Sequence, residues 1–468
     1  MKVKLDDVTD QVLSAARDFE VEAEAYAVSN NVLTVRLMNN GVFEAKAVHD
    51  IGVSVRVADE HGLGFSSTSN LDEAAIKNAV ASAVNVAKKR ELPFKMSFLE
   101  PAKPSEVEGL YDKKLAELDS GKAVELAYAM INSSLGYSKK IFDNAGVLKI
   151  VDYAVFIQNS NGLRVSDRGT FFESGLTARA RDNGKITEGA DMIGGRNLRQ
   201  IRPEDVGKNA AEMAIGGLKA KPLKDDVYPI VFGFEAVAEI IAFLCALTSP
   251  VFSKMSYPLL INKVGEKVAS EEISFYDDQT MPGGYGSCRI DDEGNPARKI
   301  PIIEKGVFNT FLYDVFNAKL EGKKVTGGAC RSLLKLPPIT GTVKFAGKSY
   351  IAAPDPVALN PVLASGDSSS EEIIKETKKG LLAKSFHYSG LTNPTRGDFT
   401  SILRMGLYQI ENGEVVGTVT KSILIDNLLD ILKNVDMVSK ELRVSGSWFL
   451  TYATVPMFRS KSRVLPTS

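Results

Sequence analysis

Residues 32–57 read VLTVRLMNNGVFEAKAVHDIGVSVRV, and this stretch decides the fold class of the first part of the chain. Apolar and β-branched side chains recur on both sides of Asn40-Gly41. An Asn-Gly pair favours the type I′ turn that joins two antiparallel strands. The stretch therefore predicts a long β-hairpin.

Helical patterns flank this hairpin. Before it, apolar residues recur at helical spacing from Val8 to Phe19. After it, Asn70 is placed to cap a helix and Glu73 follows three residues later. The apolar stripe of this second helix consists of Ile76, Ala79, Val80, Ala83, Val84 and Ala87. A stripe of this kind predicts a helix that packs across the sheet.

A second group of helix and strand signals follows a proline-containing connection at residues 92–110. Asp119 or Ser120 is placed to cap the next helix, and Gly136 is its expected stop. Strand patterns then fill residues 141–192, with turns at Asn161-Gly162 and Asn183-Gly184.

A fourth helix is predicted from Pro203 to Leu218 and leads to a polar segment, Lys219 to Asp226, rich in Lys, Pro and Asp. We place a domain boundary in that segment. The sequence thus predicts two domains, an N-terminal α+β domain at residues 1–222 and a C-terminal β-rich domain at residues 223–468.

Short apolar segments separated by Gly, Pro or Asn dominate the second domain and predict β-structure. Glu411-Asn412-Gly413-Glu414 is a further hairpin signal. Helices are expected at residues 234–247, 370–380 and 424–434, the middle one capped by a serine run. The predicted fold class is α+β, with helices packed on a sheet in the first domain and few helices in the second.

The composition excludes several function classes. Lys and Arg total 57 against 58 Asp and Glu, so the net charge of -1 creates no overall field that attracts nucleic acid or an anionic membrane. Cys245, Cys288 and Cys330 form no Cys-x-x-Cys pair, which favours a reducing compartment. The longest apolar run, residues 240–247, is too short for a membrane span. We expect a cytoplasmic, soluble protein.

Histidine is the usual zinc ligand and general base, and the chain has three. They are His49, His61 and His387, and none has a partner at ligand spacing. We interpret each as an ordinary surface or turn residue. A nucleophilic Ser or Cys motif is also missing from the sequence.

Residues 276–294 form an acidic, glycine-rich stretch that contains Asp277-Asp278 and Asp291-Asp292-Glu293. Its acidic residues do not match the spacing of a calcium loop. It is not a phosphate loop either, because no lysine or helix start follows its glycines. We predict turns and hairpins here, with a loop that faces a peptide or a partner as the alternative.

From residue 18 to about residue 450 the chain resembles the TldD/PmbA family, called modulators of DNA gyrase, and within it the PmbA (TldE) branch. Seven short strings in a fixed order carry the resemblance. They are Ile51 to Val57, Gln158 to Gly162, Asp277-Asp278, Ile290 to Gly294, Val325 to Arg331, Gly397 to Thr400 and Ile410 to Gly413.

The resemblance implies a paired assembly that acts as a zinc metallopeptidase on small or unfolded peptides. Family members hold the zinc in the TldD-type subunit, on the two histidines of His-Glu-x-x-x-His and a later cysteine. In this chain those motif positions are Phe234, Glu235 and Glu239, and residues 441–456 contain no cysteine. We therefore expect no catalytic residue and no cofactor in this chain, with zinc in a TldD-type partner.

Three functions stay open at this point. The first is a metal-free subunit that binds peptide beside a TldD-like partner. The second is a self-pairing regulatory module that binds protein and makes no direct contact with nucleic acid or membrane. The third keeps the chain catalytic through Glu235 and other carboxylates. Glu235 also has a structural interpretation, because a carboxylate near a helix start is stabilised by the helix dipole.

Overall fold

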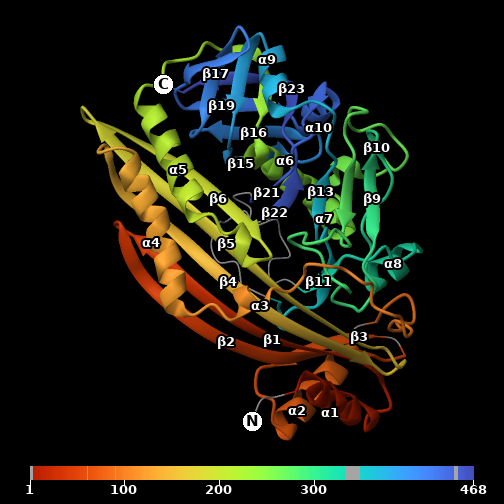
Figure 1. The fold of residues 1–468 in the computed structure, drawn as a ribbon. Coiled ribbons are helices and arrows are strands. Elements are labelled where there is room, and N and C mark those ends of the chain that lie inside the picture. The colour runs from red at the N-terminus through yellow and green to blue at the C-terminus, as the bar shows by residue number, and fades with distance from the viewer. Residues whose placement is uncertain (1–3, 61, 90, 332–347, 447–451, 468) are drawn as a thin grey trace.

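The computed structural model describes residues 4–60, 62–89, 91–331, 348–446 and 452–467. A long, curved antiparallel sheet forms one layer of the molecule, and the β-rich remainder of the chain lies against one of its faces (Figure 1). Helices gather on the opposite face and at one end of the sheet. The α+β prediction is confirmed. The division at residue 222 stays a prediction.

The long sheet has six strands in the order β3-β2-β1-β4-β5-β6. Their bounds are Glu22–Met38 (β1), Gly41–Ala58 (β2), Leu63–Thr68 (β3), Ile141–Asn159 (β4), Arg164–Asp182 (β5) and Lys185–Gly195 (β6). The predicted hairpin is β1 and β2, but its turn lies one residue earlier than expected. Met38 pairs with Gly41, and Asn39 and Asn40 have φ of 51° and 61°. Both turn residues thus have the positive φ that a type I′ turn requires.

Two helices, α1 (Leu5–Arg17) and α2 (Glu73–Ala87), cover one end of this sheet. The predicted stripe of α2 is buried as expected, against alternate residues of β1 and β2. The N-cap prediction was wrong by two residues, because the Asp72 side chain accepts from Ala75 N at 2.7 Å. Asn70 instead donates to that Asp72 carboxylate at 2.8 Å. Phe19 lies beyond α1 and is 42% exposed.

The helices α4 (Ser120–Tyr137) and α5 (Pro203–Leu218) cover the outer face, with the short α3 (Lys113–Ala116) before them. Asp119 caps α4, and α5 has the predicted bounds. Gly136 does not end α4, which runs on to Tyr137. The two helices touch closely at Gly207, where a Cβ atom would lie 2.1 Å from the carbonyl oxygen of Met130.

Strands dominate the chain after α5, in sheets of nine, six and two strands within the described residues. The bounds in the nine-stranded sheet are Asp226–Phe232 (β7), Lys379–Ala383 (β14), His387–Asn393 (β15), Asp398–Leu403 (β16), Leu407–Glu411 (β17), Glu414–Thr418 (β18), Ser422–Asn427 (β19), Met437–Val438 (β20) and Phe458–Pro466 (β23). The six-stranded sheet contains Phe275–Asp278 (β8), Lys299–Glu304 (β9), Val307–Phe308 (β10), Pro361–Leu363 (β13), Arg443–Gly446 (β21) and Tyr452–Val455 (β22). Ala329–Arg331 (β11) pairs with Pro354–Pro356 (β12).

The helices of this region are α6 (Phe234–Leu247), α7 (Pro250–Met255), α8 (Val315–Glu321), α9 (Ser370–Glu376) and α10 (Leu428–Lys433), of which α7 and α8 were not predicted. The predicted bounds of α6 are confirmed. Gly380 belongs to β14 and not to the end of α9, because residues 379–383 pair with two other strands. Leu424 belongs to β19, so α10 begins only at Leu428. Eleven of the fourteen residues of α6 are buried, and the main core cluster surrounds it. No helix of the described residues is long and apolar enough to cross a membrane.

Candidate functional site

The site begins where β7 ends and α6 starts. Gly233 is the N-cap residue, and a Cβ atom there would lie 3.0 Å from the Cα of Lys384 on the neighbouring chain segment. Phe234 is half-buried and packs against the core. Glu239 follows Glu235 by four residues, so both carboxyls project from one face of α6. Glu239 is 1% exposed.

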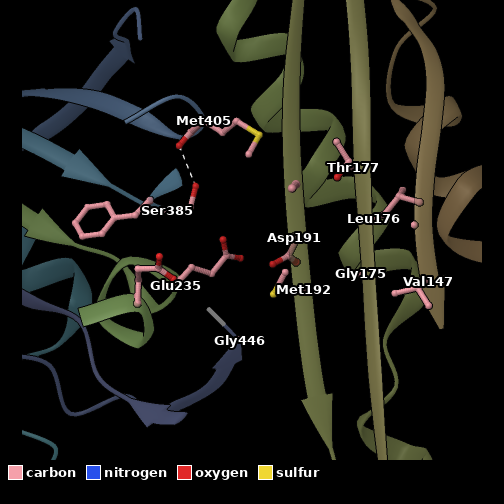
Figure 2. Close-up of a pocket in the computed structure, with 14 residues that line it drawn as sticks. Val147, Gly175, Leu176, Thr177, Asp191, Met192, Glu235, Ser385, Met405 and Gly446 are labelled. Carbon is pink, nitrogen blue, oxygen red and sulfur yellow. Dashed lines mark hydrogen bonds between the residues drawn. The ribbon is translucent and has the colours of Figure 1, made fainter. Parts of the chain in front are cut away.

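These two glutamates line a cavity of about 180 Å³ between α6 and the six-stranded sheet that contains β6. We call it the Glu235 cavity. The sheet contributes its wall through Gly175 to Thr177 of β5 and Ala190 to Met192 of β6. Phe386 and Met405 supply apolar surface on the other side. In Figure 2 the carboxyl of Glu235 extends from α6 toward that of Asp191 on β6.

The Asp191 carboxylate of this cavity is held by two side-chain donors. It accepts hydrogen bonds from Arg443 Nη2 at 2.7 Å and from Asn209 Nδ2 at 2.9 Å. Arg443 also donates to the carbonyl oxygen of Met192 at 3.3 Å. The carboxylate is therefore held in place from β21 on one side and α5 on the other.

This arrangement shifts the pKa of the Glu235 carboxyl. Burial raises its pKa well above the usual range, and the adjacent Asp191 charge raises it further, while Arg443 and Lys384 act in the opposite direction. Burial and the Asp191 charge thus favour the protonated form of Glu235. In that form the carboxyl is a hydrogen-bond donor that faces Asp191.

A second cavity, of about 280 Å³, shares Asp191 and Glu235 with the first. Phe234, Lys384 and Met457 form part of its wall. The residue in the first histidine position of the family motif therefore serves as apolar lining. Zinc does not fit here, because Phe234 has no donor atom, Asp191 is paired with a guanidinium, and the remaining carboxyls bind zinc less selectively than imidazole and thiolate do. Within the described residues, no group of three or more His, Cys, Asp and Glu side chains is placed to hold a metal ion.

The acidic stretch at residues 276–294 lies elsewhere and has another role. Glu293 accepts from Arg56 at 2.7 Å, and the same guanidinium donates to both oxygens of Glu24 at 2.9 and 2.6 Å. All three side chains are at most 2% exposed. The stretch therefore ties a loop of the β-rich region to the strands β1 and β2.

Arg331 and Lys348 extend this contact. Arg331 donates to Glu24 at 2.5 Å and to Ser54 at 3.1 Å. Lys348 donates to the Asp292 carboxylate at 2.9 Å. We call the set of Glu24, Arg56, Asp292, Glu293, Arg331 and Lys348 the buried ion network. Three of the sequence strings that carry the resemblance meet in it, namely 51–57, 290–294 and 325–331. The turn prediction for the stretch was right, and Asp277, Asp291, Asp292 and Glu293 are buried.

The histidines do not join the site. His49 hydrogen-bonds to exposed Asn31 through Nδ1 at 2.8 Å, and His61 lies outside the described residues. His387 is 7% exposed on β15, so its interpretation as a surface residue was wrong. All three cysteines are free thiols. The segment 441–456 lies partly outside the described residues, and Gly446 at the end of β21 lines the first cavity.

Phe234, Glu235 and Glu239 were identified from sequence as candidate site positions. Asp191, Asn209 and Arg443 were not. One signal was present, because Asp191 occupies an inward-facing position of a strand in which burial alternates. A charged residue at such a position needs a partner. Its partner, Arg443, is 252 residues away in sequence, so local spacing gave no indication of the pair.

The chain is 24% identical to a TldD homolog metalloprotease of Buchnera aphidicola, over 87% of this chain and 83% of that protein. A metalloprotease of Methanocaldococcus jannaschii is 26% identical over 88% of both chains. A PmbA homolog metalloprotease of Haemophilus influenzae is 23% identical over 84% of this chain and 81% of its own length.

Solved structures share the fold. TldE from Thermococcus kodakarensis aligns with a TM-score of 0.85 at 24% identity, over 98% of this chain and all of that one. A protein of Thermotoga maritima described as a putative modulator of DNA gyrase aligns with a TM-score of 0.83 at 22% identity, with the same coverage. Three sequence profiles of the PmbA/TldA metallopeptidase family match in order, domain 1 at residues 23–87, the central domain at 113–218 and the C-terminal domain at 225–462. The chain therefore belongs to the PmbA/TldD metallopeptidase family.

Proposed function

We propose that this chain is the metal-free subunit of a TldD/TldE-type zinc peptidase that acts on small or unfolded peptides, and that it contributes peptide-binding surface. The observation that carries the proposal is the lining of the cavity at the start of α6. Phe234 and Glu239 occupy the two positions where the resemblance expects zinc-binding histidines, and both line cavities there. Zinc would belong to the TldD-type partner.

The cavity chemistry supports binding. Leu176, Phe386 and Met405 give it apolar walls that suit the uncharged side chains of a peptide. Protonated Glu235 offers a hydrogen-bond donor, and Asp191 an acceptor that Arg443 and Asn209 hold in place. Few polar groups at fixed positions within apolar walls are typical of ligand pockets.

The proposal is tested with the purified full chain, alone and mixed with a TldD-type partner. We expect zinc and peptide cleavage in the mixture, and neither in this chain alone. Val147→Phe would narrow the first cavity and lower cleavage by the pair. Val415→Phe is the matched control, because Val415 is 43% exposed on β18, away from both cavities. Zinc-dependent cleavage by the chain alone would overturn the proposal.

A second candidate function is acid–base hydrolysis by this chain itself. The observation that favours it is that Glu235, whose pKa is raised by burial and by Asp191, shares one cavity with the Asp191 carboxylate that Arg443 and Asn209 hold, since two carboxyls in different environments are the usual arrangement for an acid and a base. Metal-independent peptide cleavage that Glu235→Gln abolishes would establish it. Stable self-association that excludes a TldD-type partner would instead support a regulatory module.

Three free cysteines fit a reducing compartment, and we place the assembly in the cytoplasm.

A further inference from the structure

A third cavity, of about 510 Å³, lies beside the candidate site. Its walls come from the first residues of β6, the end of α5, the turn at Arg404 to Gly406 and the segment from Thr418 to Lys421. Met405 lines both this cavity and the Glu235 cavity, and Met213 lines both this cavity and the one beside Phe234. The three cavities are therefore neighbours along one side of β6.

The charge of this third cavity is opposite to that of the first. Four cations line it, namely Arg179, Lys185, Arg404 and Lys421, against one carboxylate, Glu188. Glu188 is already engaged by two of them, because Arg404 forms an ion pair with it and Arg179 Nε lies 3.5 Å from it. Arg179 also forms an ion pair with Asp143, with Nη1 at 3.3 Å from the carboxylate oxygen Oδ2. An excess of positive charge remains after these pairs are formed.

Two other groups are consistent with this excess of positive charge. Lys185 donates to the carbonyl oxygen of Leu218 at 3.0 Å. This bond holds the ammonium near the cavity and does not neutralise its charge. His387 lies close enough that Arg404 and Lys421 help burial to lower its pKa, with Glu188 acting in the opposite direction. The cavity therefore presents positive potential next to apolar surface from Ile186 and Val419.

We propose that this cavity, the basic cleft, binds the C-terminal carboxylate of the peptide that occupies the Glu235 cavity. The inference rests on the proposed peptide-binding function and adds a substrate class to it, peptides with a free C-terminal carboxylate. Lysine and arginine donors form charge-assisted bonds to carboxylates that are about twice as strong as neutral ones. The apolar walls favour a peptide over a small inorganic anion.

The test compares two labelled octapeptides with uncharged side chains, one with a free C-terminal carboxylate and one amidated, by fluorescence anisotropy on the full chain. We expect the free acid to bind about tenfold more tightly at low salt, with the difference shrinking as salt screens it. Lys421→Gln should reduce the difference to about threefold or less. Lys461→Gln removes an exposed lysine of β23 that does not line the cleft, and should leave the difference unchanged.

Each outcome decides between the two inferences. Equal affinity for the two octapeptides would overturn the carboxylate site while leaving peptide binding intact. Binding of neither peptide by the chain, alone or with a TldD-type partner, would overturn the proposed function and the basic cleft with it. Sub-millimolar binding of inorganic phosphate that competes with the free acid would assign the cleft to phosphate ligands and overturn the peptide assignment.

Discussion

The buried ion network and the Glu235 cavity both place charged groups between the six-stranded sheet of β1 to β6 and the later part of the chain, yet they are built differently. In the network, Arg56 contacts two carboxylates at 2.6 to 2.9 Å and Arg331 shares one of them. In the cavity, Arg443 pairs with Asp191 while burial and the Asp191 charge favour the protonated form of Glu235, and space for a ligand remains. Closed charge pairs hold the two parts together, and incompletely paired charges mark where a ligand fits.

The largest expected effect is the loss of Arg56. Arg56→Met leaves Glu24 and Glu293 buried without their shared cation, so we expect the free energy of unfolding to fall by about 3–5 kcal/mol. Urea denaturation at pH 7 measures it. Arg164→Met is the control, because Arg164 pairs with exposed Asp6 and Asp10, and it should cost less than about 1 kcal/mol. Equal effects would show that the network does not hold the two parts together.

The same experiment in the cavity should give a smaller effect. Asp191→Asn leaves Arg443 without its carboxylate, but Arg443 is 32% exposed and water replaces part of the interaction. We expect a loss of about 1–2 kcal/mol in urea denaturation. Asp436→Asn removes an exposed pair with Arg459 and should cost about 0.5 kcal/mol or less. Asp191→Asn should also lower the pKa of Glu235, since the Asp191 charge helps to raise it.

Beside the network, the carboxylates outnumber the cations. Five carboxylates, Glu24, Asp291, Asp292, Glu293 and Asp314, face three cations, Arg56, Arg331 and Lys348. Burial and the Glu293 charge raise the pKa of Asp314 to about 7, and the same two causes raise that of Asp291 to about 7. Partial protonation of Asp291 and Asp314 near neutral pH therefore offsets part of the excess negative charge.

A pH series tests this balance. Folded Asp314 binds its proton more tightly than the unfolded chain, where the pKa is near 3.8, so the free energy of unfolding falls as pH rises toward and through 7. Asp314→Asn should remove about 1 kcal/mol of the loss between pH 6 and pH 8. Asp291 keeps its own contribution, so the slope is reduced and not abolished. The variant retains the cap of α8, because Oδ1 still accepts from Asn317 N. An unchanged slope would contradict the assignment.

Much of the fold around these two regions was predictable from sequence. Strand patterns along residues 32–57 and 141–192, together with Asn-Gly turns, predicted the long sheet, and a helical stripe predicted α2. The bounds of α5 were also predicted. Local patterns carry this information because hairpins and amphipathic helices are stabilised by neighbours in sequence. At Asn39-Asn40 the turn moved by one residue, since both asparagines adopt positive φ and Gly41 begins the next strand.

The candidate site was only partly predictable. Phe234, Glu235 and Glu239 follow one another on α6, so a motif identified them. Their partners come from β6, α5 and β21, and the pairing of Asp191 with Arg443 depends on tertiary structure alone. In the acidic stretch, Glu293 lies 237 residues away from its partner Arg56, so no local pattern indicated the network.

The smallest expected effect is at Glu235. Because burial and the Asp191 charge favour the protonated carboxyl, Gln has nearly the same shape, charge and donor capacity as that form. We expect Glu235→Gln to change the free energy of unfolding at pH 4 by less than about 0.5 kcal/mol, in contrast to Arg56→Met. As pH rises above about 4.5, the unfolded wild type loses the Glu235 proton before the folded protein does, so the wild type loses stability relative to the variant. Urea denaturation at pH 4 and pH 7 measures both differences. A loss of several kcal/mol at pH 7 would mean that Glu235 is ionised and paired, and the cavity would then be closed in the same way as the network.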